Sequence, residues 1–132
     1  MAIYANTDMD LAAESDISAL VEVFRLRCYV LSYTVQHHRW TVTVEASEES
    51  SNLDSHNRSP SEHLRHILAV VESLSKVERA QWDSCTLRNI NVGFECDNTW
   101  AFEHSIANED LARLARAGCT LTVTMYPHAQ IS

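Results

Sequence analysis

The sequence predicts an α+β domain with a mainly antiparallel sheet and two to three helices on one face, a ferredoxin-like core with additions. Two patterns carry this prediction. Helix-like and strand-like segments follow one another in the order β-α-β-β-α-β-(β)-α-β, and three of the strands alternate apolar and polar residues. A chain of 132 residues has no room for a second domain, and a hydrophobic content of 45% is enough for one core. We therefore expect a single domain over residues 1–132.

The N-terminal elements are a short strand and a helix. Residues 2–5 are a short apolar stretch that predicts the strand, and the polar run at residues 6–10 follows it. A helix then begins at a cap formed by Ser15 or Asp16. Its apolar residues recur at spacings of three and four until it ends near Leu26.

Two further strands form an antiparallel hairpin. Residues 27–35 are β-branched and aromatic with apolar residues on both faces, which predicts a strand that is covered on both sides. A polar break at residues 36–39 separates them from residues 40–46, where apolar and polar side chains alternate. Residues 47–59 lack periodicity and predict a mobile loop.

The second helix has a clear start. Ser59 and Glu62 form a capping box, with Pro60 at the first helical position. The apolar stripe of this helix ends with Leu74 and the helix runs to about Val77, after which a connection leads to a third alternating strand at residues 89–96.

The C-terminal unit is a helix, a glycine stop and a strand. Residues 100–104 predict a short return strand before it. Asn108 is the expected N-cap, Gly118 ends the helix, and an alternating strand begins directly afterwards. The apolar residues that we expect in the core of this unit include Leu111, Leu121 and Val123.

Several of these features occur together in one known family. Trp40 opens a strand, a long polar loop follows, the next helix runs around Leu64 to Leu74, and the chain ends LARLARAGCTLTVTMYP. In these features the chain from Trp40 to the C-terminus resembles the bacterial domain-of-unknown-function family 4279. The resemblance implies an α+β fold and a bacterial or phage origin, and it implies no activity for any residue. The part before Trp40 departs from the family, because the glycines and prolines of that family's first turns are missing.

The chain is acidic, with a formal net charge of −8, and Lys76 is its only lysine. A nucleic-acid backbone or an anionic membrane is therefore a poor partner, and a basic protein is the natural one. Asp8 and Asp10 stand where a signal peptide would be basic and apolar, and no apolar run reaches the roughly 20 residues that span a bilayer. We expect a cytoplasmic protein.

Motifs for cofactor binding and nucleophilic catalysis are missing from the sequence. With two glycines in the whole chain, Gly93 and Gly118, no glycine-rich phosphate loop exists, and no serine lies in a G-x-S-x-G elbow. The four cysteines are scattered, which favours buried thiols over a disulfide or zinc framework. We expect no cofactor.

Seven histidines raise the alternative of a metal site. His63 and His66 are one helical turn apart, but Glu62 precedes both, and zinc-protease motifs need histidines four residues apart with the glutamate between them. The pair is therefore a candidate that lacks the full motif. A third ligand would come from His37, His38, His56 or His104.

Acidic residues concentrate in two segments. Residues 1–22 contain five acidic residues and no basic one, and residues 45–62 contain five acidic residues and one arginine. Two solvated stretches would explain this pattern; an acidic face that attracts a basic partner and raises the association rate is the sharper hypothesis. Its candidate partner-binding residues are Asp8, Asp10, Asp16, Glu45, Glu48, Glu49 and Asp54.

These observations favour a non-catalytic acidic binding protein of the inhibitor or immunity type, which occludes the basic active site of a toxin or of a nucleic-acid-handling enzyme. Two alternatives stay open. One is a phage-encoded inhibitor of a host defence system, and the other is a small hydrolase or metal-dependent enzyme that uses His63 and His66.

Overall fold

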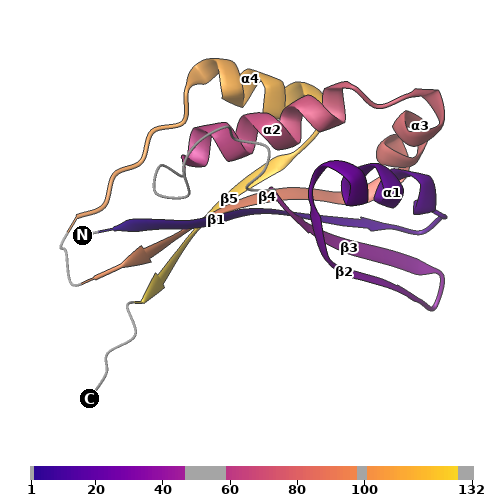
Figure 1. Ribbon diagram of the computed structural model, residues 1–132, viewed down its shortest axis with the longest axis horizontal. Coiled ribbons are helices and arrows are strands. Elements are labelled where there is room, and N and C mark those ends of the chain that lie inside the picture. The colour runs from indigo at the N-terminus through magenta and orange to yellow at the C-terminus, as the bar shows by residue number, and fades with distance from the viewer. Residues whose placement is uncertain (1, 47–58, 98–100, 128–132) are drawn as a thin grey trace.

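The computed structural model describes residues 2–46, 59–97 and 101–127. These residues form one five-stranded sheet and four helices (Figure 1). The strands are β1 (Ile3–Ala13), β2 (Tyr29–Gln36), β3 (Arg39–Glu45), β4 (Cys85–Cys96) and β5 (Thr120–Pro127). The helices are α1 (Ser18–Arg27), α2 (Pro60–Glu72), α3 (Lys76–Ser84) and α4 (Asn108–Ala117).

The sheet has the order β2-β3-β1-β4-β5, with β1 at its centre. β1 is antiparallel to β3 on one side and to β4 on the other, and β2 and β3 form an antiparallel hairpin. Through α4 the chain returns to β5, which lies parallel to β4 at the sheet edge. The predicted α+β class with a mainly antiparallel sheet is confirmed. The first four strands have the ferredoxin-like order, and α4 and β5 are the addition.

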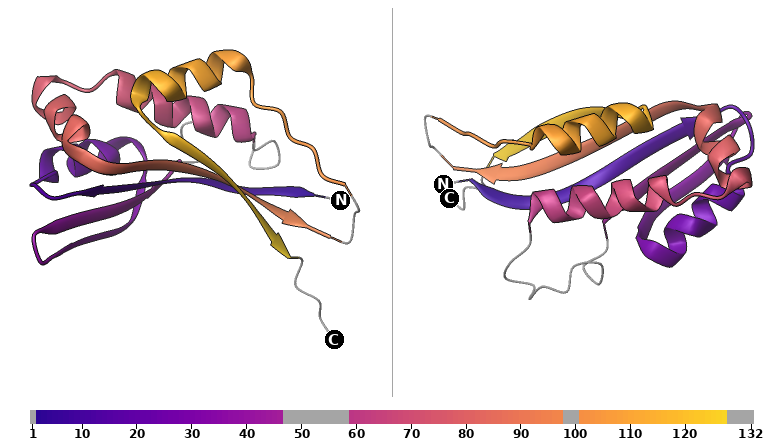
Figure 2. Two further views of the ribbon diagram at one scale, coloured as in Figure 1. Left: turned by 180° about the vertical axis from the view of Figure 1, so that it is seen from behind. Right: turned by 90° about the horizontal axis from the view of Figure 1, so that it is seen from above.

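All four helices lie on the same side of the sheet, and none of the described helices covers the other side (Figure 2). The core fills the space between the sheet and the helices. Met9 and Leu11 of β1, Phe24 of α1, Ile67 of α2 and Trp82 of α3 are each at most 1% exposed. The sheet therefore has one face buried under the helices and one face that no described helix covers.

Two helix ends that the sequence marks are confirmed. The side chain of Ser59 accepts a hydrogen bond from the backbone N–H of Glu62 at 3.4 Å, and α2 begins at Pro60. Gly118 ends α4 with φ of 74°, a left-handed conformation that costs glycine little because it has no Cβ.

The predicted hairpin between β2 and β3 is also confirmed. It turns at His37 and His38, which both have positive φ, 52° and 59°. Two successive positive φ angles give a tight turn whose twist matches that of the antiparallel strands.

β1 is longer than the sequence predicts. The polar run at residues 6–10 lies within the strand, so the prediction of a strand limited to residues 2–5 is wrong. Thr7 and Met9 are buried under the helices, and Asp8 and Asp10, which alternate with them, point to the uncovered side. A sheet with one solvated face accepts acidic and amide side chains at every second position, so a composition typical of loops is compatible with a strand here.

The prediction of a single helix that reaches Val77 is also wrong, because α2 ends at Glu72 and α3 is a separate helix. The hydroxyl of Ser73 donates to the carbonyl oxygen of Val70 at 2.9 Å, a local bond that competes with continuation of the helix. Ser75 then occupies the N-cap position of α3, and its hydroxyl donates to the carboxylate of Glu78.

The edge strands are more exposed than predicted. β2 lies at one edge of the sheet with most of its side chains exposed, so the prediction that this strand is covered on both sides is wrong. At the other edge Val123 is 45% exposed, and Leu111 of α4 is equally exposed. The prediction that both residues lie in the core is therefore wrong. Helix α4 turns Leu114 inward instead and covers little of β5. Leu121 is partly buried against the core.

Two smaller differences and one untested prediction concern the connections. Residues 101–107 contain no strand, so the described part of the predicted return strand does not form, and residue 100 lies outside the described residues. The N-cap of α4 is Ala107, one residue before Asn108. Residues 47–58 of the predicted loop also lie outside the described residues.

Candidate partner-binding face

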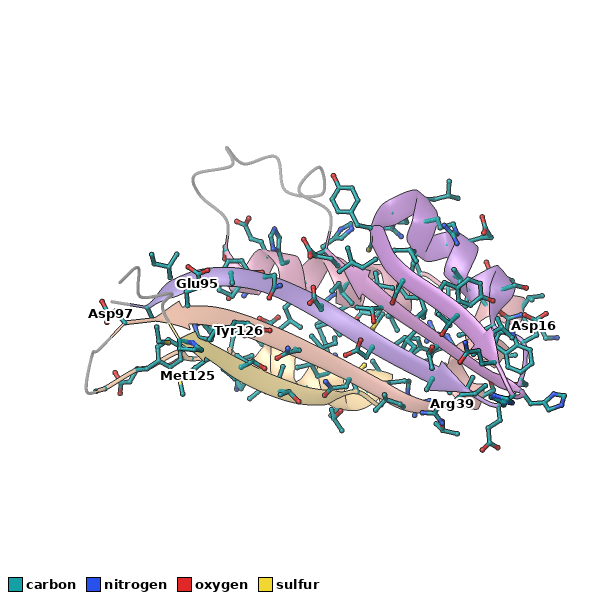
Figure 3. All side chains as sticks on the ribbon, turned by 90° about the horizontal axis from the view of Figure 1, so that it is seen from below. Asp16, Arg39, Glu95, Asp97, Met125 and Tyr126 are labelled. Atoms are coloured by element: carbon teal, nitrogen blue, oxygen red, sulfur yellow. The ribbon has the colours of Figure 1, made fainter. Side chains whose placement is uncertain are left out.

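The uncovered side of the sheet carries polar side chains from all five strands, and we call it the open face (Figure 3). Side chains alternate between the two sides of a strand, so the core residues of each strand leave their polar neighbours on the open face. The residues of this face include Asn6, Asp8, Asp10, Thr34, Thr41, Thr43, Glu45, Asn89, Asn91, Gly93, Glu95, Thr120, Thr122, Thr124 and Tyr126.

The strand register arranges these side chains in rows across the sheet. Asp8 of β1 lies directly opposite Glu45 of β3 on one side and Asn91 of β4 on the other, and Asn91 pairs with Thr122 of β5. Directly opposed residues have Cβ atoms about 4.5–5.5 Å apart, so their polar groups interact. One row therefore combines two carboxyl groups, an amide and a hydroxyl.

Hydrogen bonds between side chains hold parts of the open face in place. The Thr43 hydroxyl donates to Oδ1 of Asp10 at 2.7 Å, and the hydroxyls of Thr120 and Thr122 donate to Oδ1 of Asn89 at 2.8 and 3.0 Å. Side chains that are already ordered lose less conformational entropy when a partner binds. The open face is thus partly preorganised.

The carboxyl group of Asp8 is partly desolvated and faces like charges. Its Oδ1 atom is buried without a hydrogen-bond partner among the described residues. Burial, followed by the charges of Glu45 and Asp10, raises the pKa of Asp8 to about 6. The three carboxyl groups repel one another near neutral pH, and a cation from outside would relieve that repulsion.

The glycine of β4 makes room for two open-face side chains. A Cβ atom at Gly93 would lie 2.6 Å from Oδ1 of Asn6 and 2.9 Å from the ring of Tyr126. The Tyr126 ring therefore lies against the glycine and covers the gap that a missing side chain leaves in a sheet. This aromatic ring lies at the end of the face where Glu95 is also found (Figure 3).

The structure brings together three of the predicted partner-binding residues, namely Asp8, Asp10 and Glu45. Asp16 does not join them. It lies beyond the end of β1, where its carboxylate accepts a hydrogen bond from the backbone N–H of Ser18 at 2.8 Å and so stabilises the start of α1. Glu48, Glu49 and Asp54 lie outside the described residues.

The two candidate metal-ligating histidines face different surroundings. His63 is buried, and its Nδ1 lies 2.7 Å from the hydroxyl of Tyr4. His66 uses Nε2 to donate to the backbone carbonyl oxygen of Arg27 at 2.7 Å. The pair is therefore engaged with groups on different elements.

The other histidines do not join this pair. His37 and His38 form the hairpin turn, His104 packs on the ring of Phe94 with centroids 4.9 Å apart, and His56 lies outside the described residues. In the described part of the chain, no group of three or more His, Cys, Asp or Glu residues is placed to hold a metal ion.

The cysteines form no disulfide. Burial raises the pKa of Cys85 and that of Cys119 to about 11, so both thiols are protonated at neutral pH. A protonated thiol is a poor nucleophile, which favours the structural role that the sequence predicts for Cys85 and Cys119.

The threonines and asparagines of the open face are functional candidates that sequence reasoning missed. A signal for them exists, because Asn89, Asn91, Thr120, Thr122 and Thr124 occupy the polar positions of two alternating strands. What the alternation alone does not give is the pairing of those strands, which sets the two polar stripes side by side.

Comparison of the chain with protein-family models, with curated proteins and with solved structures finds no match. The resemblance to domain-of-unknown-function family 4279 therefore stays a prediction. Among the described helices, none has both the length and the apolar character needed to cross a bilayer.

Proposed function

We propose that the protein is a non-catalytic, cytoplasmic binding protein of the inhibitor or immunity type, and that its open face covers a basic surface of a toxin or of a nucleic-acid-handling enzyme. The observation that supports this most is the carboxyl cluster of Asp8, Asp10 and Glu45 on a sheet face that no described helix covers.

The chemistry of the open face fits arginine and lysine side chains. Asp8 and Glu45 stand opposite each other, so one guanidinium group can approach both carboxylates and replace their mutual repulsion with two charge-assisted hydrogen bonds. The surrounding threonine and asparagine groups can bind the polar rim of a partner. A surface of this kind raises the association rate and the specificity of binding through complementary charge.

The protonation of Asp8 makes this proposal sensitive to pH. Because the pKa of Asp8 is about 6, part of the population carries a proton on this carboxyl at slightly acidic pH, and a bound cation favours the ionised form. Binding of the basic partner should therefore release a proton near pH 6 and weaken as the pH falls towards 5.

The test is affinity capture from the native host with two variants of the full chain. The open-face variant carries Asp8→Asn, Asp10→Asn and Glu45→Gln. The control variant carries Glu22→Gln, Asp83→Asn and Glu109→Gln, three exposed residues of helices on the other side of the sheet, and it has the same net charge.

The proposal expects a basic protein that the wild type and the control variant retain and that the open-face variant loses. Calorimetry of that complex in buffers with different ionisation enthalpies should then report proton release near pH 6. If both variants retain the partner equally, the carboxyl cluster is not the binding surface and the proposal is wrong.

A further inference from the structure

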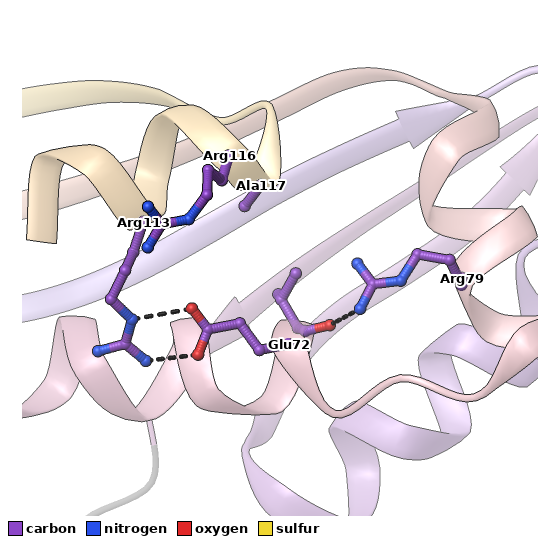
Figure 4. A pocket seen from close by; sticks show the side chains of 6 residues that line it. Glu72, Arg79, Arg113, Arg116 and Ala117 are labelled. Atoms are coloured by element: carbon purple, nitrogen blue, oxygen red, sulfur yellow. Dashed lines mark hydrogen bonds and ion pairs between the residues drawn. The ribbon is translucent and has the colours of Figure 1, made fainter.

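A pocket lined by arginines lies in the helix layer, on the opposite side of the sheet from the open face (Figure 4). It has a volume of about 180 Å³ and is formed by α2, α3 and α4. Its lining holds three guanidinium groups and one carboxylate, an excess of two positive charges in a chain whose net charge is −8. The lining residues are Val71, Glu72, Arg79, Arg113, Arg116 and Ala117.

Two of the three guanidinium groups are held in position. Nε and Nη2 of Arg113 donate to the two carboxylate oxygens of Glu72 at 2.8 and 2.7 Å, and this pairing lowers the pKa of Glu72. Arg79 uses Nη2 to donate to the carbonyl oxygen of Val71 at 2.5 Å, in the last turn of α2. These bonds fix two positive groups at the pocket without neutralising all of its charge.

Arg116 makes no hydrogen bond or ion pair with any described residue. Its place in the last turn of α4 could serve the carbonyl groups at that helix end, but these have other donors. The backbone N–H of Gly118 bonds the carbonyl of Ala115 at 3.1 Å, and the indole N–H of Trp82 bonds that of Ala117 at 3.0 Å. Arg116 also stands three residues from Arg113 on the same helix, where like charges repel.

The volume and the charge of the pocket define a class of ligand. Drug-sized ligands occupy pockets of roughly 300–1,000 Å³, so this pocket suits a smaller group. Guanidinium groups match tetrahedral oxyanions through paired N–H donors. We propose that the pocket binds a small divalent oxyanion of the phosphate class, held by Arg116 and Arg79, while Glu72 competes with the ligand for Arg113. This site is separate from the open face and does not depend on the proposed function.

Isothermal titration of the full chain with inorganic phosphate at low ionic strength tests this proposal. The wild type should bind one phosphate per chain. Arg116→Ala should weaken binding at least tenfold, since a charge-assisted bond is among the stronger hydrogen bonds. Glu72→Gln should tighten binding about threefold or more, because it removes a competing negative charge and releases Arg113.

Arg25→Ala is the matched control, because Arg25 pairs with Glu22 on the surface of α1, outside the pocket. It should leave phosphate affinity unchanged. Phosphate should also raise the melting temperature of the wild type and of the control, but not that of Arg116→Ala, which separates loss of the site from loss of the fold.

Methyl phosphate distinguishes the source of the ligand. If methyl phosphate binds as tightly as inorganic phosphate, the natural ligand is the phosphoryl group of a larger molecule. If only inorganic phosphate binds, the natural ligand is the free ion. The proposal is overturned if the wild type shows no stoichiometric phosphate binding, if Arg116→Ala binds as tightly as the wild type, or if Glu72→Gln binds more weakly.

Discussion

β1 and β5 both alternate apolar and polar residues, yet they contribute differently to the molecule. β1 lies at the centre of the sheet, bonded to a strand on each side, and its apolar side chains Met9, Leu11 and Ala13 are at most 1% exposed under the helices. β5 lies at the edge, bonded only to β4 among the described strands, and Val123 and Met125 on its helix side stay exposed. Burial therefore depends on what lies over a strand and beside it, and the alternation alone does not determine it.

The same comparison separates two roles of the sheet. The centre supplies the core on one side and the carboxyl cluster on the other, so stability and the proposed binding surface share one strand. The edge unit of α4 and β5 extends the open face with hydroxyl groups, and β5 is joined to the rest of the sheet by its parallel pairing with β4.

The largest expected difference is between substitutions at apolar positions on the helix side of the two strands. Leu11→Ala in β1 should lower the free energy of unfolding by about 2–5 kcal/mol, because it removes buried methylene groups and leaves a cavity. Val123→Ala in β5 should lower it by less than about 0.5 kcal/mol, as is usual for exposed sites. Urea denaturation measures both, and equal losses would contradict the contrast between centre and edge.

The next effect concerns the attachment of the edge unit. Arg88 of β4 donates to the carbonyl oxygens of Trp82, Cys85 and Gly118, at 3.0, 3.0 and 3.1 Å, and so joins the ends of α3 and α4. Arg88→Met keeps the aliphatic stem and removes these bonds, which should cost about 1–3 kcal/mol.

Hydrogen exchange gives the regional readout of that substitution. Amides of β5 should exchange faster in Arg88→Met than in the wild type, while amides of β1 change less. Arg25→Met, at an exposed site of α1, is the control and should change neither strand. Equal acceleration of β1 and β5 would show that Arg88 supports the whole fold and not the edge unit.

Local signals in the sequence predicted many of the helix ends and turns. Ser59 with Pro60 and Gly118 mark their helix ends because capping depends on a few neighbouring residues. Ser75 followed three residues later by Glu78 was an equally local signal for the start of α3, and it was missed.

Features that depend on distant residues could not be predicted in this way. The polar residues of β1 resemble a loop until β3 and β4 are known to flank them. Leu111 and Val123 lie at apolar positions of good patterns, but burial also requires a covering element, which periodicity does not specify. Of the candidate site, the acidic residues could be named from the sequence, while the opposition of Asp8 and Glu45 required the strand register.

A third prediction concerns the open side of β1. The folded protein holds a proton on Asp8 up to a pKa of about 6, above the ordinary value of 3.8, so this group lowers stability as the pH rises between those values. Asp8→Asn should therefore stabilise the protein at pH 7 by about 1 kcal/mol, a figure reduced for the partial exposure of the carboxyl.

The stabilisation by Asp8→Asn should shrink as the pH falls through 6 and vanish near pH 4. Thermal or urea melts across this range measure it. Asp83→Asn, at an exposed site of α3, is the control and should show no such pH dependence. A loss of stability in Asp8→Asn at pH 7 would mean that the carboxylate is favourably paired in the folded protein.

A small effect is expected in the hydroxyl contacts of β5. Asn89→Ala removes the acceptor of the Thr120 and Thr122 hydroxyls, which are exposed and can bond to water instead. The loss should be about 0.5 kcal/mol, at the low end for a hydrogen bond. Denaturation melts would contradict this if the loss exceeded that of Arg88→Met.

The association rate with the basic partner, followed by stopped flow over a range of salt concentrations, tests the central claim most directly. Exposed charges act over about 10 Å at 0.1 M salt and less above it, so steering by the carboxyl cluster weakens as salt is added. The wild type and the Glu22/Asp83/Glu109 control variant should associate fast at low salt and slow steeply with salt. The Asp8/Asp10/Glu45 variant should associate about tenfold more slowly at low salt and approach the wild-type rate at high salt. If all three proteins share one rate and one salt dependence, the open face does not steer the partner and the account is wrong.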